Sequence, residues 1–402
     1  MLDERAQAFP EGNVGVMAAS TGLNVAAILL WVSVLSLIMR DLGASDLQIS
    51  WCVALWNVAN ALVQYEGGRL SDRLGRVPLI VWSTYLSAVG IIAAAFAPSW
   101  LLFALLYTVW NAANAVGGPA FATIVGESVP PERRGWAYGV MEFVASLGII
   151  IGPLAGARLL PIVEAKGLFV ITGLVFLSTA CFRQFKLKET RPAGSRETSF
   201  RFSQVFQRSL RPVLVVSVAF QLLMLLTLWG PFMALYSSDV MGLTKAQINV
   251  YFGVAFAASA LCSLLAGKAV DRFGHKRVLA WSVAALTGAT LLWTAQRGVT
   301  GIGVGFVLIA SASQLAAVSF QTYRMSVIDP GIRTRAVGAV GALSSLSAAL
   351  AVPVAGWLKA ATPGAPFYLV ILVAVVTIVA LSGPGLRQMA APTAAPGGGA
   401  AG

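Results

Sequence analysis

The feature that most constrains this chain is a series of long apolar runs, broken at regular intervals by short segments rich in charged and turn-forming residues. A helix needs about 20 apolar residues to cross a bilayer and, with a short connection, uses about 33. The 402 residues therefore accommodate about twelve spans. Charged residues make up only 11% of the chain and the mean hydropathy is +0.79. These values exclude a water-soluble enzyme, a disordered chain and a fibrous repeat.

The breaks between the apolar runs predict an all-α membrane protein with twelve transmembrane helices in two six-helix bundles. The first six helices are expected near residues 14–39, 47–67, 77–97, 100–125, 135–160 and 166–183. The second six are expected near residues 212–237, 246–267, 276–296, 299–324, 335–358 and 365–385. The first run is longer than the apolar core of a signal peptide and follows an acidic leader, so we interpret it as a span.

The predicted organisation follows from these runs. A cytoplasmic N-terminus (1–13) precedes the N-terminal bundle (14–183), a charged cytoplasmic linker (184–211) and the C-terminal bundle (212–385). The tail 386–402 is rich in Ala, Pro and Gly and is expected to be disordered. The linker is interpreted as a solvated connector, although its aromatic residues among arginines also fit a short interfacial helix.

The distribution of basic residues predicts the orientation. Twelve spans place both termini on one side of the membrane, and that side collects 22 of the 28 Lys and Arg residues, against 6 on the other side. Basic residues concentrate in cytoplasmic loops. We therefore expect a multi-pass protein of the cell membrane with both termini in the cytoplasm, and we give the net charge of +12 little weight as a sign of nucleic-acid binding.

The two halves of the chain repeat each other. One set of residues recurs at an offset of 199, pairing Gly68, Asp72, Arg73 and Gly75 with Gly267, Asp271, Arg272 and Gly274. A second set recurs at an offset of 200, pairing Pro153 and Gly156 with Pro353 and Gly356. Because each half has six predicted spans, the copies share one orientation and form a parallel repeat. Such repeats favour a transporter over a receptor or a membrane enzyme.

The first copy, Gly68-Arg69-Leu70-Ser71-Asp72-Arg73-Leu74-Gly75-Arg76, resembles the signature between helices 2 and 3 of the major facilitator superfamily. The second copy begins at Gly267, and the resemblance extends from about residue 14 to residue 385. It implies two bundles that rock about a central cavity. A short turn between helices needs glycine where φ is positive.

The resemblance also implies a cytoplasmic latch. Asp72 would lie against the start of helix 11 in the other half, where the helix dipole favours an anion. Arg76 would pair with Glu127. The expected gating residues also include Arg73, Arg134, Asp271 and Arg272. The alternative interpretation is that these charges only set the topology.

A second motif lies in helix 5, where Gly148, Gly152-Pro153 and Gly156 resemble a signature of the family's drug–proton antiporters. Small residues four apart allow a neighbouring helix to approach closely, and this general packing role is the alternative. The chain departs from that branch at Ala157, where a further glycine is usual, and at Tyr107, where proton-coupled exporters often have arginine.

In this fold, helices 1, 4, 7 and 10 are expected to face the cavity. Their polar and aromatic side chains are neutral, which suits amphipathic or uncharged solutes, although each residue also fits a simple hydrogen bond between helices. The predicted cavity residues are Asn24, Trp31, Tyr107, Trp110, Asn111, Asn114, Gln221, Trp229, Gln314 and Gln321.

Two acids are candidates for proton coupling. Glu142 lies about two turns into helix 5, where partial loss of solvent would let it load and release a proton. Glu66 ends helix 2 and is the second candidate, although a place in the cytoplasmic gate is favoured for it. Either acid also fits a purely structural ion pair.

The sequence therefore predicts a secondary active exporter of hydrophobic or amphipathic compounds, coupled to protons and acting as a monomer. The alternatives are a transporter of sugars or amino acids and a non-transporting sensor or lipid-moving protein. We expect no enzyme activity and no cofactor. A single histidine and three scattered cysteines do not suit a zinc site. No nucleotide motif for an ATP-driven pump is present in the sequence.

Overall fold

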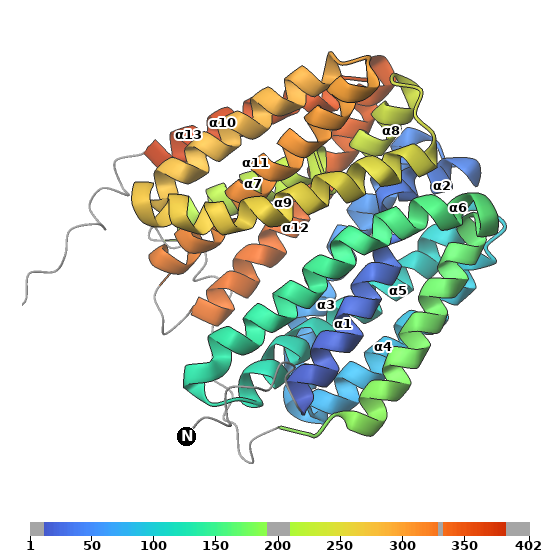
Figure 1. Ribbon diagram of the computed structural model, residues 1–402, viewed down its shortest axis with the longest axis vertical. Helices are drawn as coiled ribbons and strands as arrows, with labels where there is room; N and C mark the ends of the chain where they lie inside the picture. The colour runs from blue at the N-terminus through green and yellow to red at the C-terminus, as the bar shows by residue number, and fades with distance from the viewer. Residues whose placement is uncertain (1–11, 191–209, 329–332, 383–402) are drawn as a thin grey trace, which may run out of the picture.

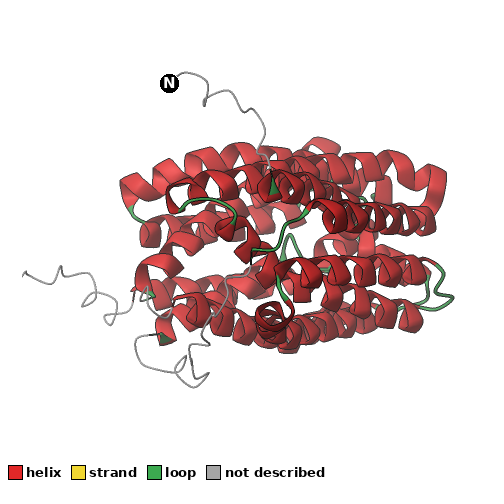
Figure 2. Ribbon diagram, turned by 90° about the horizontal axis from the view of Figure 1, so that it is seen from below, coloured by secondary structure: helices red, strands yellow, loops and turns green. Residues whose placement is uncertain are grey.

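A computed structural model describes residues 12–190, 210–328 and 333–382. These residues form helices joined by short loops, and no strand occurs among them (Figure 2). The predicted tail 386–402 lies outside the described residues, as do most of the predicted linker 184–211 and of the N-terminal segment 1–13.

The helices form two groups, which we call the N-terminal half and the C-terminal half (Figure 1). The N-terminal half contains α1 (Asn13–Leu29), η1 (Val32–Val34), α2 (Leu35–Asp41), α3 (Asp46–Leu74), α4 (Arg76–Ala95), α5 (Trp100–Glu127), η2 (Pro131–Arg133) and α6 (Arg134–Lys186). The C-terminal half contains α7 (Arg211–Leu226), α8 (Phe232–Asp239), α9 (Lys245–Phe273), α10 (His275–Thr294), α11 (Val299–Val327), α12 (Arg333–Ala361) and α13 (Ala365–Ser382).

Several of these elements combine into membrane-length passes. Helices α1 and α2 join through η1 into one apolar stretch, and α7 and α8 follow each other in the C-terminal half. Helix α6 spans 53 residues and turns back at Glu164, whose φ of 56° is not helical. Eight helices among the described residues are long and apolar enough to cross a bilayer. The arrangement is consistent with the twelve predicted spans.

Helices α3 and α9 are longer than predicted and run through most of the signature segments. We expected the second helix to end near residue 67 and Gly68–Arg76 to form a turn, but α3 continues to Leu74. Only Gly75 breaks the helix, with φ at 101°, and its repeat counterpart Gly274 has φ at 83°. Residues with a Cβ rarely adopt this conformation. One glycine in each half therefore makes the turn.

The repeat also sets how α3 and α9 begin. Each helix starts with a capping box, in which a hydroxyl and a glutamine exchange bonds with each other's backbone amides. Ser45 and Gln48 form the box of α3, and Thr244 and Gln247 form that of α9. The parallel repeat therefore extends to the helix starts, beyond the residues that revealed it in the sequence.

The two halves meet at one end of the molecule. Helix α3 packs against α12 and α6 packs against α9, and α2 also contacts α8. In Figure 1 the halves converge near α2 and α8 and diverge toward the opposite end, where α1 begins. We call these the α8 end and the Gly75 end.

The predicted orientation can be tested with two single cysteines, in a chain whose native cysteines are replaced by alanine. Ser238 lies beside Asp239 at the α8 end, whereas Ser195 falls in the predicted linker, outside the described residues. An impermeant maleimide added to intact cells should label Ser238→Cys and not Ser195→Cys. Inverted vesicles should give the reverse result. Labelling of both from outside would refute the predicted topology.

Candidate functional site

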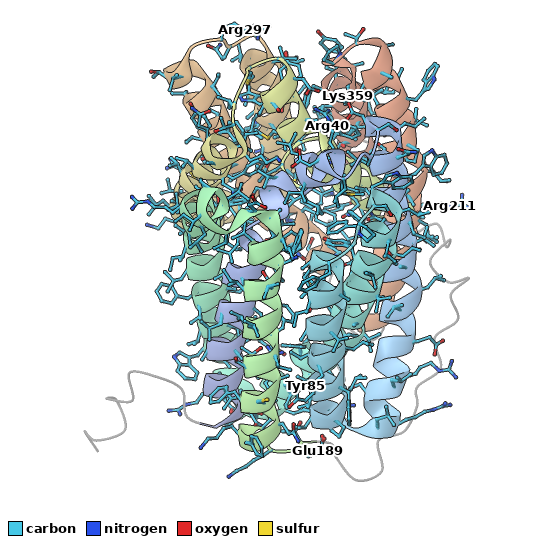
Figure 3. All side chains as sticks on the ribbon, turned by 90° about the vertical axis from the view of Figure 1, so that its right-hand side faces the viewer. Arg40, Tyr85, Glu189, Arg211, Arg297 and Lys359 are labelled. Atoms are coloured by element: carbon cyan, nitrogen blue, oxygen red, sulfur yellow. The ribbon has the colours of Figure 1, made fainter. Side chains whose placement is uncertain are left out.

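Four charged side chains join the two halves at the α8 end. Arg40 and Asp46 come from the N-terminal half, and Asp239 and Lys359 come from the C-terminal half. Figure 3 labels Arg40 and Lys359, which lie near each other at this end. Arg40 lies 2.6 Å from Asp46 and 2.5 Å from Asp239. Lys359 pairs with the same two carboxylates, because its Nζ lies 2.5 Å from Asp46 and 2.8 Å from Asp239. We call these four residues the ion-pair ring.

The ion-pair ring balances two cations with two carboxylates. The Lys359 side chain is only 4% exposed, so its charge depends on both carboxylates for compensation. Burial alone would raise the pKa of Asp239, but hydrogen bonds and charges from Arg40 and Lys359 outweigh this effect and lower the pKa below its ordinary value. Asp239 is therefore ionised at neutral pH while the ring is closed.

The ion-pair ring was not predicted, because in the sequence Arg40 and Lys359 count only among the six basic residues expected on the outer side. One signal was present: Arg40 and Asp239 are 199 residues apart and so occupy equivalent positions in the two copies. Opposite charges at equivalent positions near a pseudo-twofold axis are able to pair across it.

Two glycines of the repeat lie where the halves touch. A Cβ on Gly156 would lie 2.9 Å from the amide nitrogen of Asn249, which donates a 3.0 Å hydrogen bond to the Leu30 carbonyl. A Cβ on Gly356 would lie 2.6 Å from the Cβ of Ser50. The close packing predicted for the fifth helix, which is the first part of α6, is therefore present. The third glycine of its motif, Gly156, contacts the C-terminal half.

The rest of the helix 5 motif packs within the N-terminal half. A Cβ on Gly152 would lie 2.6 Å from the Ala26 carbonyl, and one on Gly148 would lie 2.6 Å from the Gly22 carbonyl. Pro153 is buried beside them. The first two glycines of the motif thus allow α6 to lie directly against α1.

We predict that Gly356→Leu opens the α8 end, because a larger side chain there fits only when the halves move apart. Overpacking costs about 1–3 kcal/mol, and the whole cost falls on the closed arrangement. A cysteine at Ser36, buried between the halves at 4% exposure, should become more reactive from outside. Gly288→Leu is the control, because a Cβ there meets open space. Equal reactivity in both variants would contradict the prediction.

At the Gly75 end, the predicted ion pair between Arg76 and Glu127 is present. Arg76 Nη2 lies 3.4 Å from Glu127 Oε1, and Arg76 Nη1 donates to Ser71 Oγ at 3.1 Å. Arg76 is only 6% exposed. The side chain of Asp72 lies outside the described part of the structure, so its contact with the start of the eleventh predicted helix, which corresponds to α12, stays a prediction.

The remaining predicted gating residues lie near this end. Arg134 donates through Nε to the Gly126 carbonyl at 3.0 Å, which ties α6 to α5. Arg73 is exposed, and so are Asp271 and Arg272 in the second copy. Their gating roles stay predictions.

Four predicted cavity residues lie inside the N-terminal half. Trp31 is fully buried and contacts the rings of Tyr107 and Trp110 at centroid distances of 5.9 and 5.6 Å. Its Nε1 donates to Thr172 at 2.9 Å. Asn24 is also buried, and it accepts a 2.8 Å hydrogen bond from the hydroxyl of Thr179. In this conformation these side chains join α1, α5 and α6.

The other predicted cavity residues are more accessible. Trp229 is 50% exposed and stacks on Phe256 at 5.5 Å. Gln321 is exposed and accepts a hydrogen bond from Arg324 at 2.5 Å. Asn114 is also exposed, whereas the half-buried members are Asn111, Gln221 and Gln314. The structure therefore divides the predicted set into a packed group and an accessible group.

The two candidate proton sites are exposed. Glu142 lies two turns after Arg134 in α6, and the burial that the sequence analysis expected is absent in this conformation. Glu66 is paired with Arg69 at 3.2 Å, and both side chains are about half exposed. Among the residues that the structure describes, no group of three or more His, Cys, Asp or Glu side chains is suited to hold a metal ion.

Arg183, which ends the sixth predicted helix and is one of the 22 basic residues counted on the cytoplasmic side, does not lie in solvent. Helix α6 continues to Lys186, and Arg183 is buried at 1% exposure. Its guanidinium donates to Ser20 at 2.9 Å and to Thr84 at 2.8 Å, and it lies 4.5 Å from the ring of Phe121. It thereby ties α6 to α1, α4 and α5.

The sequence matches proteins named for drug resistance. It is 25% identical to the multidrug resistance protein MdtG of Proteus mirabilis over 62% of this chain, a match that spans 64% of that relative. It is 26% identical to the class C tetracycline resistance protein of Escherichia coli, over 83% of this chain and 86% of that protein. An uncharacterized MFS-type transporter of Bacillus subtilis, YhjO, is 22% identical over 79% of each chain.

Solved structures share the fold. An inward-facing, occupied bacterial homologue of the lysosomal transporter Spinster superposes with a TM-score of 0.75 at 15% identity, over 94% of this chain and 96% of that one. The human organic anion transporter MFSD10 gives 0.68 at 18% identity, over 92% and 98%. The sequence model of the Major Facilitator Superfamily matches residues 14–257 and 215–397. This chain therefore belongs to the Major Facilitator Superfamily, as a multi-pass membrane transporter.

Proposed function

We propose that the protein exports hydrophobic or amphipathic compounds from the cell by proton antiport and alternating access. The observation that carries this proposal is the ion-pair ring, which joins the two halves at the α8 end while the halves diverge toward the Gly75 end. A transporter closed on one side needs contacts that exist in only one of its states. The ring supplies such contacts, because its members come from both halves.

The distribution of basic residues supports the proposed orientation. With both termini in the cytoplasm, the α8 end faces outward and the structure is the inward-facing state of the transporter. The bundles 14–183 and 212–385, joined by the linker 184–211, would rock as two bodies. In the outward-facing state the Gly75 end would close instead, with Asp72, Arg76 and Glu127 forming the latch.

The substrate class rests on side-chain chemistry and on the named relatives. The accessible candidates Asn114, Gln321 and Trp229 offer neutral amides and an aromatic face. Such groups bind amphipathic solutes without requiring a matching charge. Two relatives are named for resistance to multiple drugs and to tetracycline. Export of such compounds is the function that fits both observations.

A reconstituted transport assay tests the proposal. Proteoliposomes with an acidic lumen should accumulate a neutral amphipathic dye, because protons leaving the lumen drive the dye inward. The dye must not be a weak base, since weak bases accumulate in acidic vesicles without any protein. Collapse of the pH gradient should abolish accumulation. Accumulation of sugars or amino acids in place of the dye would contradict the proposed substrate class.

A further inference from the structure

The first residues after α6 form a strap across the Gly75 end of the N-terminal half. The strap comprises residues 187–190, and Leu187 anchors it by burying its side chain in a cluster with Val14 and Leu79. The backbone of Lys188 exchanges two hydrogen bonds with the Asn13 side chain, at 2.8 and 2.9 Å. The linker therefore leaves the N-terminal half from a fixed point.

Glu189 of the strap caps helix α4. Its Oε1 accepts from the Arg76 amide at 3.1 Å and its Oε2 accepts from the Val77 amide at 3.0 Å. The first amides of a helix have no partner within the helix, and the helix dipole favours an anion there. The residue at the cap position is Gly75, which has no side chain to serve as the acceptor. A carboxylate from the strap takes that role.

The two copies of the signature differ at this point. A Cβ on Gly75 would lie 2.7 Å from Glu189 Oε2, whereas a Cβ on the equivalent Gly274 would meet open space. Gly75 thus makes room for the carboxylate as well as making the turn. The arrangement belongs to the N-terminal copy and is not a general consequence of the repeat.

The strap also reaches the predicted latch. Thr190 donates its hydroxyl to Glu127 Oε2 at 2.6 Å, while Glu127 Oε1 pairs with Arg76. The strap therefore contacts the backbone amide of Arg76 through Glu189 and the carboxylate of Glu127 through Thr190. These contacts all lie within the N-terminal half, so a rigid rotation of the halves does not need to break them.

We propose that Glu189 is a positioning residue for the cytoplasmic latch, which it acts on through the Gly75 turn. This inference rests on the proposed alternating-access function. An ordered turn loses less conformational freedom when the C-terminal half docks on it. Loss of Glu189 should therefore disfavour the latched, outward-open state and slow turnover, while leaving substrate binding unchanged.

The test measures distances between spin labels at Glu132 and Met325, which are exposed at the Gly75 ends of the two halves. Glu189→Ala should lower the ratio of short to long distances by about 3- to 10-fold, the range expected when a loosened segment must be ordered on docking. It should lower kcat with KM unchanged. Glu189→Gln, which keeps one acceptor oxygen, should have a smaller effect. Lys188→Ala is the control, because Lys188 joins the strap through its backbone.

Asp72→Asn separates this inference from the proposed function. It should shift the distances in the same direction, and Glu189→Ala should add little to it, because both act on one latch. Unchanged distances in Glu189→Ala, or a lower melting temperature as its only effect, would overturn the positioning role. A shift by Glu189→Ala without one by Asp72→Asn would also overturn it. Failure of the proposed function would appear separately, because the wild-type protein would then show no dye transport in the proteoliposome assay.

Discussion

Replacing Lys359 by glutamine should change the equilibrium between the closed and the open α8 end by about 30-fold in favour of the open one. This factor corresponds to about 2 kcal/mol. The Lys359 side chain is 4% exposed and bonds to both Asp46 and Asp239. Without it, two carboxylates share Arg40 in a partly buried site. When the halves separate, water hydrates all three groups, so the cost falls on the closed state alone.

The measurement is the reactivity of a cysteine at Ser36 toward an impermeant reagent added outside, which should rise in Lys359→Gln. Lys245→Gln is the matched control. Lys245 also pairs across the halves, with Asp41, but these side chains are 30% and 58% exposed. Exposed pairs contribute about 0–1 kcal/mol. If the two variants raise the reactivity equally, burial within the ring is not what holds the α8 end closed.

The ring also predicts a pH dependence. The pKa of Asp239 is lowered while the ring is closed, so the closed state binds fewer protons than the open state. Ring stability is therefore present above the ordinary carboxyl pKa of about 4 and is lost as the pH falls through the lowered value. Acid lowers the thiolate content of every cysteine, so the reactivity of a cysteine at Ser36 is compared with that of a cysteine at Ser238. Acidifying the outside should raise this ratio in a chain with an otherwise unchanged ring. Asp239→Asn should remove most of this dependence.

The sequence predicted those parts of the site that depend on local rules. A positive φ was expected at a glycine of the turn, and Gly75 adopts it, while the pair between Arg76 and Glu127 was expected from the family resemblance. The close approach at Gly156 followed from the spacing of small residues along one helix face. The turn and the close approach follow from local chemistry, whereas the pair joins residues 51 positions apart and followed from the resemblance alone.

The missed features depend on contacts between distant segments. The pairs of Lys359 with Asp46 and Asp239 join residues 313 and 120 positions apart, and their distances depend on how the halves dock. The burial of Arg183 was not predicted because charge counting assumes that an arginine near a helix end lies in water. In the structure, hydroxyls of α1 and α4 solvate it instead. Neither arrangement leaves a periodic pattern in the sequence.

Glu142→Gln should abolish concentrative transport while substrate binding and counterflow exchange survive, because only the coupled step needs a titratable group. Under a pH gradient, dye accumulation by this variant should fall to the level of protein-free vesicles. Glu132→Gln is the matched control, since Glu132 is an exposed acid near the same end in η2. It should retain coupled transport.

The structure gives this prediction a physical basis that differs from the one expected at first. Glu142 is exposed while the α8 end is closed, and Gly156 of the same helix touches Asn249 in the other half about four turns away. In the proposed rocking motion, that contact would open and the Glu142 part of α6 would approach the C-terminal half. Exposure in one state and contact with the C-terminal half in the other would link the Glu142 carboxyl to the proposed rocking motion. If Glu142→Gln still concentrates the dye, the coupling proton binds elsewhere, and Glu66 is the next acid to replace.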